Sequence, residues 1–197
     1  MIEVAGTIDE RFAAVGALFE RNLESGADVG ASVCVLHRGE PVVDLWGGWV
    51  DEDHTRPWEA DTIVNVWSTT KTMTFLVALM LADRGELDLH APVARYWPEF
   101  AAEGKGDITV ANILAHTAGL PGWSDPVRPE QLPDWDECCR RLAAQAPWWE
   151  DRTRSGYHAL TQGYLIGEIV RRVTGTTIGS FFAAEVAAPL GADYFIG

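Results

Sequence analysis

The residues that could do chemistry are a serine and a lysine three positions apart, in Ser68-Thr69-Thr70-Lys71, at the start of a long apolar run. Because helix positions i and i+3 share a face, the Ser68 hydroxyl and the Lys71 amine can meet. A serine hydroxyl attacks only when a neighbour accepts its proton, and a lysine can do so where burial disfavours its charge. The apolar residues that follow predict a helix buried on most sides. The spacing therefore predicts an activated serine nucleophile.

The choice of lysine at this position supports the same interpretation. The chain has 15 basic residues, of which only Lys71 and Lys105 are lysines, and random placement would give about 0.06 Ser-x-x-Lys pairs. Arginine could not replace Lys71 as a base, because its side chain stays charged. The spacing alone leaves one alternative open, in which Ser68 is a helix N-cap and Lys71 is a surface residue of the first turn.

The composition describes an acidic globular chain. Of its 197 residues, 47% are hydrophobic and 22% are charged, which suits one domain or two closely packed lobes with a substantial core. The net charge of −14 argues against nucleic acid or an anionic membrane as a partner. Nine tryptophans suggest an aromatic-lined cleft, and Trp148 and Trp149 could either line such a pocket or cover the core.

Neither a disulfide framework nor a metal site is indicated. The three cysteines are Cys34 and the adjacent pair Cys138 and Cys139, and no C-x-x-C occurs. Asp88 and His90 are too isolated to form a metal-binding pair. The first residues lack the basic and apolar regions of a secretory signal, and no apolar run is long enough to span a bilayer, so we expect a cytoplasmic location.

Hydrophobic periodicity and turn residues predict helices together with an antiparallel hairpin. A capping box at Thr7-Ile8-Asp9-Glu10 predicts a helix that ends at Gly26, and alternation predicts strands over residues 31–36 and 42–46. Further helices are expected from Ser68 to Gly85 and over residues 111–116, 134–146, 158–173 and 177–187. A helix followed by a hairpin is not a βαβ unit, so the sheet is expected to be antiparallel.

Two further segments extend the pattern that begins at Ser68. Ile113-Leu114-Ala115-His116-Thr117-Ala118-Gly119-Leu120 follows it, and Tyr157 comes next, ahead of an expected helix. These motifs, in this order, resemble the Ser-x-x-Lys, LLxHTSGL and Tyr-x-Asn motifs of the serine β-lactamase-like superfamily. That group joins class C β-lactamases, D-alanyl-D-alanine carboxypeptidases and family VIII carboxylesterases. The resemblance covers residues 31–197.

The resemblance implies the α+β serine β-lactamase/transpeptidase-like fold, an antiparallel sheet flanked by helices together with a helical lobe. We expect residues 1–60 to supply a helix and the hairpin, and residues 61–187 to form the mainly helical lobe that carries Ser68. The family continues into further strands with a Lys-Thr-Gly or His-x-Gly motif, which this sequence lacks. We therefore expect the N-terminal half of a longer protein, weakly active or inactive alone, that self-associates through an open sheet edge.

The resemblance also implies acyl transfer through a covalent intermediate, with Ser68, Lys71 and Tyr157 as the catalytic residues. Ser68 would attack a carbonyl carbon, its proton would be relayed by Lys71 and Tyr157, and its backbone N–H would stabilise the oxyanion. A tyrosine becomes a usable base only near cations, and Lys71 could supply that field. The family uses no histidine base at position 116, so His116 is expected to stabilise its turn and His158 to point elsewhere. No cofactor or metal is implied.

One departure from the motifs bears on the substrate. Two residues after Tyr157 the chain has Ala159, where β-lactamases and the carboxypeptidases have an asparagine that is expected to bind the substrate's side-chain amide. We therefore expect a carboxylesterase on small esters, with a β-lactamase or D,D-peptidase as the alternative. A non-catalytic binding module that keeps the fold is the alternative from another class. The expected partner is a small-molecule ester or amide, with no nucleic acid and no membrane.

Overall fold

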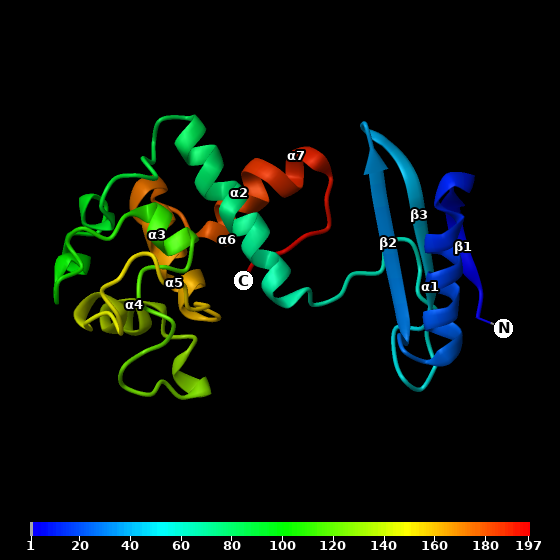
Figure 1. Ribbon diagram of the computed structural model, residues 1–197, viewed down its shortest axis with the longest axis horizontal. Helices are drawn as coiled ribbons and strands as arrows, with labels where there is room; N and C mark the ends of the chain where they lie inside the picture. Colours follow the sequence, from blue (N-terminus) through cyan, green and yellow to red (C-terminus); the bar gives the residue numbers. More distant parts are fainter. Residues whose placement is uncertain (1) are drawn as a thin grey trace. The chain divides into compact units, whose positions relative to one another are not determined.

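A computed structural model describes residues 2–197 (Figure 1). These residues form two compact units, one that ends at Val64 and one that runs from Asn65 to Gly197. Within the described residues, no helix combines the length and the apolarity needed to cross a bilayer.

The sheet of the first unit has three antiparallel strands in the order β1-β3-β2. The strands are β1 (Val4–Ile8), β2 (Gly30–His37) and β3 (Glu40–Gly48). The predicted hairpin of β2 and β3 is confirmed, with its turn at Arg38 and Gly39, which both have positive φ. β1 and β2 are the two edges of the sheet, so β3 lies between two strands.

The predicted capping box at Thr7 is wrong, because Thr7 belongs to β1 and pairs with Asp44 of β3. The N-cap is Asp9, whose side chain accepts a hydrogen bond from Arg11 N (2.9 Å) at the start of a 3-10 turn over Glu10–Phe12. Helix α1 (Ala13–Ser25) follows and ends at Gly26, as predicted. A short edge strand carries little local signal, because its conformation depends on the partner strand.

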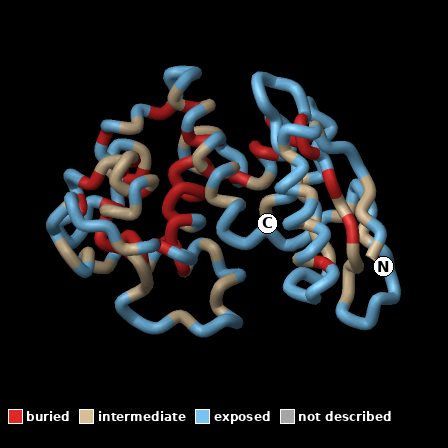
Figure 2. Tube along the Cα trace, turned by 45° about the vertical axis from the view of Figure 1, so that its right-hand side comes forward, coloured by how far each residue is buried: buried red, intermediate tan, exposed pale blue. Residues whose placement is uncertain are grey.

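Helix α1 covers one side of this sheet and closes a small core. Val43 and Leu45 are two residues apart on β3, so their side chains face the same side of the sheet. Gly16 of α1 lies close to Leu45 and Ile8, which allows the helix to approach the strands closely. The buried core residues, coloured red in Figure 2, are Val42, Val43 and Leu45, with Val4, Phe12, Phe19 and Val33 packed against them.

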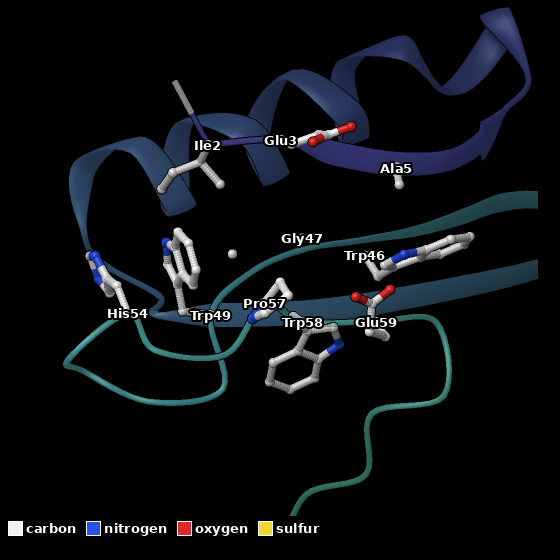
Figure 3. Close-up of a pocket in the computed structure, with 11 residues that line it drawn as sticks. Ile2, Glu3, Ala5, Trp46, Gly47, Trp49, His54, Pro57, Trp58 and Glu59 are labelled. Carbon is white, nitrogen blue, oxygen red and sulfur yellow. The ribbon is translucent and has the colours of Figure 1, made fainter.

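The segment after β3 folds back against the end of the sheet and lines a cavity of about 470 Å³ (Figure 3). Trp49 pairs with Pro57 across this segment and stacks on His54, with ring centroids 5.2 Å apart. Among the described residues, the lining contains tryptophan, glutamate and histidine side chains but no serine, threonine, cysteine or lysine. The described lining therefore offers no hydroxyl, thiol or amine nucleophile.

The second unit is helical. Its helices are α2 (Thr70–Asp83), α3 (Val110–Leu114), α4 (Trp135–Ala144), α5 (Thr161–Thr174), α6 (Ile178–Phe182) and α7 (Ala188–Leu190), with a π-helical stretch over Ala183–Ala187. Short 3-10 turns cover Trp67–Thr69, Val93–Arg95, Pro98–Ala101 and Pro129–Gln131. The helices predicted in this region are all present, and Gly85 and Gly175 take left-handed conformations just after α2 and α5.

Helix α2 packs one face into the core of this unit, against α5 and α6. Val77 and Leu81 of α2 are completely buried, in the same cluster as Leu165 of α5. The prediction that α2 is buried on most sides is wrong, because Leu76 and Leu79 expose 37% and 54% of their surface. The buried stripe anchors α2, and with it the turn that carries the candidate nucleophile.

Candidate active site

Ser68 lies in the 3-10 turn Trp67–Thr69, which leads directly into α2. The N-cap positions of the turn and of the helix are Val66 and Thr69, and neither end has a side-chain cap. The alternative in which Ser68 is a helix N-cap is therefore wrong. Trp67 has φ 49°, a left-handed conformation that costs a non-glycine residue about 1–2 kcal/mol. Strain of this kind tends to occur at functional sites.

Lys71 lies on the first turn of α2 and points back at Ser68. Its Nζ donates a hydrogen bond to Ser68 Oγ (3.3 Å), so the predicted contact between these side chains is confirmed. The same amine donates to the backbone carbonyl of Ala159 (2.8 Å). Sequence analysis missed this second partner, because any residue type can supply a backbone carbonyl. The two acceptors together hold the amine beside the serine oxygen.

Tyr157 reaches the same oxygen from a segment 89 residues further along the chain, and its hydroxyl donates a hydrogen bond to Ser68 Oγ (2.5 Å). Lys71 Nζ lies 5.1 Å from the centre of the Tyr157 ring. The hydrogen bond with Ser68 and the positive charge of Lys71 lower the pKa of Tyr157 below its usual value of 10. The three side chains named from the sequence therefore converge, and Tyr157 is a stronger acid than a free tyrosine.

His116 holds the backbone on both sides of Tyr157. Its Nδ1 accepts a hydrogen bond from His158 N (3.1 Å), and its carbonyl accepts one from Gly156 N (3.0 Å). The His116 and Tyr157 rings meet edge to face, with centroids 5.0 Å apart. His116 follows α3 with φ 61°, and its N–H donates to the carbonyl of Ile113 (3.2 Å), so it closes the turn there as expected. Its contacts on both sides of Tyr157 give it a positioning role that the sequence did not indicate.

His158 points away from Ser68, as predicted, and is completely buried. Its Nδ1 donates to the carbonyl of Gly156 (2.6 Å), and its Nε2 accepts from Leu120 N (3.0 Å), an arrangement that suits the neutral imidazole. Burial lowers the pKa of His158 to about 4. Burial and the charge of Lys71 lower the pKa of His116 as well. Both imidazoles are therefore neutral at neutral pH.

The same contacts correct the predicted start of α5. We expected this helix to begin at His158, but it begins at Thr161, whose hydroxyl donates to the carbonyl of Leu120 (2.6 Å). The backbone N–H groups of Gly156 and His158 donate hydrogen bonds to His116, so they are not part of a helical hydrogen-bond pattern. Periodicity cannot reveal such tertiary contacts. Their effect is to present Tyr157 and the Ala159 carbonyl to α2.

An apolar cavity of about 480 Å³ lies beside Lys71 and Ala159. Its walls include Trp135 of α4, Tyr164 of α5 and Ile178 of α6. Sequence analysis did not predict this cavity, because its walls come from separate helices whose packing no single motif describes. Trp148 and Trp149, which the sequence suggested for a pocket, are not part of its lining.

Comparisons with known proteins identify relatives of this chain. The profile of the Beta-lactamase family matches residues 15–194. Esterase/beta-lactamase LipL of Mycobacterium tuberculosis is 42% identical over 190 residues, which are 96% of this chain and 44% of LipL. A family VIII carboxylesterase structure is 48% identical with a TM-score of 0.92, over 99% of this chain and 54% of that one. A penicillin-binding protein homologue from Caulobacter crescentus is 43% identical with a TM-score of 0.94, over 99% and 53% of the two chains.

The relatives match nearly the whole of this chain, whereas this chain matches only part of each relative. The chain spans about half the length of the curated relatives it matches, 44% of one and 50% of another. The solved relatives superpose on both its antiparallel sheet and its helices, so the predicted α+β serine β-lactamase/transpeptidase-like fold is confirmed. The family profile and the relatives together establish that this chain belongs to the Beta-lactamase family.

Proposed function

We propose that the protein is a serine hydrolase that cleaves carboxylic esters through an acyl-enzyme, with Ser68 as nucleophile. The observation that carries the proposal is the convergence of the Tyr157 hydroxyl and Lys71 Nζ on Ser68 Oγ, at 2.5 Å and 3.3 Å. The names of two relatives, an esterase/beta-lactamase and a family VIII carboxylesterase, support a hydrolase that accepts esters.

In the first half-reaction, Ser68 Oγ forms a bond to the acyl carbon of the ester while its proton passes to the pair formed by Tyr157 and Lys71. The ester C–O bond breaks, and the departing alkoxide takes a proton from the same pair and leaves as the alcohol. In the second half-reaction, water attacks the acyl carbon and gives its proton to the pair. The acid then leaves as Ser68 Oγ regains a proton.

The local charges suit this sequence of steps. The hydrogen bond with Ser68 and the charge of Lys71 lower the pKa of Tyr157, which makes its phenolate accessible as a base next to Ser68. The Ser68 N–H lies at the N-terminal end of α2, where the helix dipole favours negative charge, and it is the proposed donor to the oxyanion. Removal of one such donor typically costs about 10²–10³ in rate.

A second candidate function is β-lactam hydrolysis, which the name of the relative LipL includes. Ala159 argues against it, because a methyl group cannot donate a hydrogen bond to the side-chain amide of a β-lactam. The comparison of a nitrophenyl acetate with a chromogenic cephalosporin separates these two activities. A binding module without turnover is the candidate from another class, and an active-site probe separates it from both enzymes.

The test of the proposal is covalent labelling with a fluorophosphonate, followed by mass spectrometry. It is done on the 197-residue chain and on the product of its whole reading frame. We expect the label on Ser68, hydrolysis of nitrophenyl acetate, and loss of both in Ser68→Ala. Ser25→Ala, at an exposed position near the end of α1, is the matched control and should keep both. A label on another serine, or no label on either form of the protein, would contradict the proposal.

A further inference from the structure

The cavity at the end of the sheet in the first unit combines tryptophan rings with carboxylates in its lining (Figure 3). Trp46 of β3, Trp49 and Trp58 line it together with Glu3 and Glu59. Its volume of about 470 Å³ is in the range of pockets that bind small molecules. As far as the structure describes this lining, it contains no lysine or arginine. Aromatic faces beside uncompensated negative charge are the two features that attract an organic cation.

The ring of Trp46 lies on the face of the sheet opposite α1. Trp46 and Leu45 are neighbours on β3, so their side chains point to opposite faces, and Leu45 is the one that lies close to α1. The residues paired with Trp46 are Ala5 on β1 and Ser32 on β2. Neither of these two small side chains is large enough to cover the indole, so its face is available to a ligand.

Trp58 brings a hydrogen-bond donor without a partner to the same lining. Its backbone N–H donates to the carbonyl of Gly48 (2.9 Å), and its ring lies so close to Gly30 that a Cβ there would come within 2.7 Å of it. Trp49 is held by stacking on His54, with the ring planes 11° apart. Within residues 2–197, Trp58 Nε1 is buried and has no hydrogen-bond partner. An unpaired buried donor is destabilising, and an oxygen of a ligand would satisfy it.

Glu3 and Glu59 supply the negative charge. Glu3 directly precedes β1, and Glu59 lies on the segment that folds back, so the two carboxylates belong to different parts of the lining (Figure 3). Both residues are exposed, and neither belongs to the ion pairs described within residues 2–64. Exposed carboxylates attract a cation only weakly, so the tryptophan rings must contribute as well. This combination favours a quaternary ammonium group, because such a cation binds to aromatic faces.

We propose that this cavity binds a small quaternary ammonium compound that carries an oxygen acceptor, with choline as the simplest example. The ammonium group lies against the rings of Trp46 and Trp49, near the two carboxylates, and the oxygen accepts the hydrogen bond of Trp58 Nε1. The cavity belongs to the first unit and Ser68 to the second, so the proposal does not rest on the proposed hydrolase.

NMR titration of the indole N–H resonances, assigned by replacing single tryptophans with phenylalanine, tests the proposal. It is done on the 197-residue chain and on the product of its whole reading frame. Choline should give saturable shifts, and 3,3-dimethylbutan-1-ol, which has the same shape without the charge, should not. Glu59→Gln should weaken choline binding by about threefold or more, because it removes one charge and keeps the size of the side chain. Glu52→Gln, at an exposed position of the same segment outside the lining, is the matched control and should keep the wild-type Kd.

Trp58→Phe separates the oxygen contact from the attraction of the charge. The change removes the N–H and keeps an aromatic ring, so choline should bind about fivefold more weakly, whereas the Kd of tetramethylammonium, which has no oxygen, should stay the same. Glu59→Gln alters an exposed side chain, so it tests the site even if the smaller ring disturbs the packing on Gly30. The proposal would be overturned by any of four results: no saturable shift with the whole product, binding of the neutral alcohol as tight as that of choline, or an unchanged choline Kd in either Glu59→Gln or Trp58→Phe.

Discussion

Acidification from pH 7.5 to pH 4 should destabilise the helical unit through His158. This imidazole is completely buried, and its two hydrogen bonds require the neutral form. Burial lowers its pKa to about 4, from 6.5 when it is free in water. Above pH 6.5 the ring is neutral in both the folded and the unfolded states, so it adds no pH dependence. Between pH 6.5 and pH 4 the unfolded chain binds the proton and the folded one does not, so stability falls.

The size of this loss follows from the two pKa values. One pKa unit corresponds to about 1.4 kcal/mol, so the separation between 6.5 and about 4 gives a loss of about 3 kcal/mol by pH 4. Domains of this kind are stable by about 5–15 kcal/mol in total, so the loss is readily measured. His116, whose pKa is also lowered, adds to it in the same direction. Glu137, whose pKa is about 2 because of its ion pairs with Arg140 and Arg141, loses its contribution mainly below pH 4.5.

Urea unfolding of the wild type and of His158→Gln at pH 7.5, 5.5 and 4.0 measures the effect. The glutamine amide can still accept from Leu120 N but does not titrate. We expect the wild type to lose about 3 kcal/mol more than the variant over this range. His90→Gln, at an exposed turn, is the control and should follow the wild type. Equal losses in wild type and His158→Gln, or a His158 imidazole that titrates near pH 6.5 by NMR, would refute the reasoning.

Three further predictions follow from contacts at other places in the structure. Ala159→Asn should raise the turnover of a chromogenic cephalosporin relative to that of nitrophenyl acetate by about tenfold or more, because the new amide can pair with the side-chain amide of the β-lactam. Parallel assays with both substrates check this, and an unchanged ratio would contradict it. Glu168→Gln should lower the free energy of unfolding by about 3 kcal/mol, since this carboxylate is 1% exposed and pairs with Arg171 and Arg172. Glu137→Gln, which removes an ion pair with Arg141 nearer the solvent, should have a clearly smaller effect. Urea titration compares the two variants, and equal effects would be the contrary result. The expected self-association through the sheet edge should weaken in Val35→Lys, because the change places a charge on the edge strand β2, where Val35 and Leu36 are exposed. Sedimentation velocity tests this, and unchanged association would point to another surface.

Helices and strands whose ends are determined by neighbouring residues in the sequence could be predicted. The hairpin follows from alternation on both sides of Gly39, and the ends of α1, α2 and α5 follow from Gly26, Gly85 and Gly175. β1 could not be predicted, because a strand of five residues becomes one only when β3 offers it a partner. The order of the motifs, not the periodicity, identified the fold.

The candidate site likewise has contacts that the sequence predicts and contacts that it does not. The Ser68 and Lys71 contact follows from helical spacing alone, since positions i and i+3 face each other. Tyr157 lies 89 residues from Ser68, so no spacing rule could join them, and the resemblance to the family supplied it. The neutral state of His116 and His158 depends on burial, and the cavity beside Lys71 depends on the packing of four helices, so neither could be inferred from residue types.

Two of the strained residues in the helical unit stand directly beside the converging side chains. Trp67, with φ 49°, precedes Ser68, and His116, with φ 61°, contacts the backbone on both sides of Tyr157. Glycine would adopt either conformation without strain. At position 116, however, glycine would also remove the Nδ1 acceptor of His158 N, and the loss of about 1–3 kcal/mol from that unsatisfied N–H is comparable to the backbone strain of about 1–2 kcal/mol. Among residues 2–197, no side-chain hydrogen bond of Trp67 explains the strain there. Its backbone N–H instead donates to Asn65 Oδ1 (3.0 Å), so the conformation belongs to the turn that presents the serine hydroxyl ahead of α2.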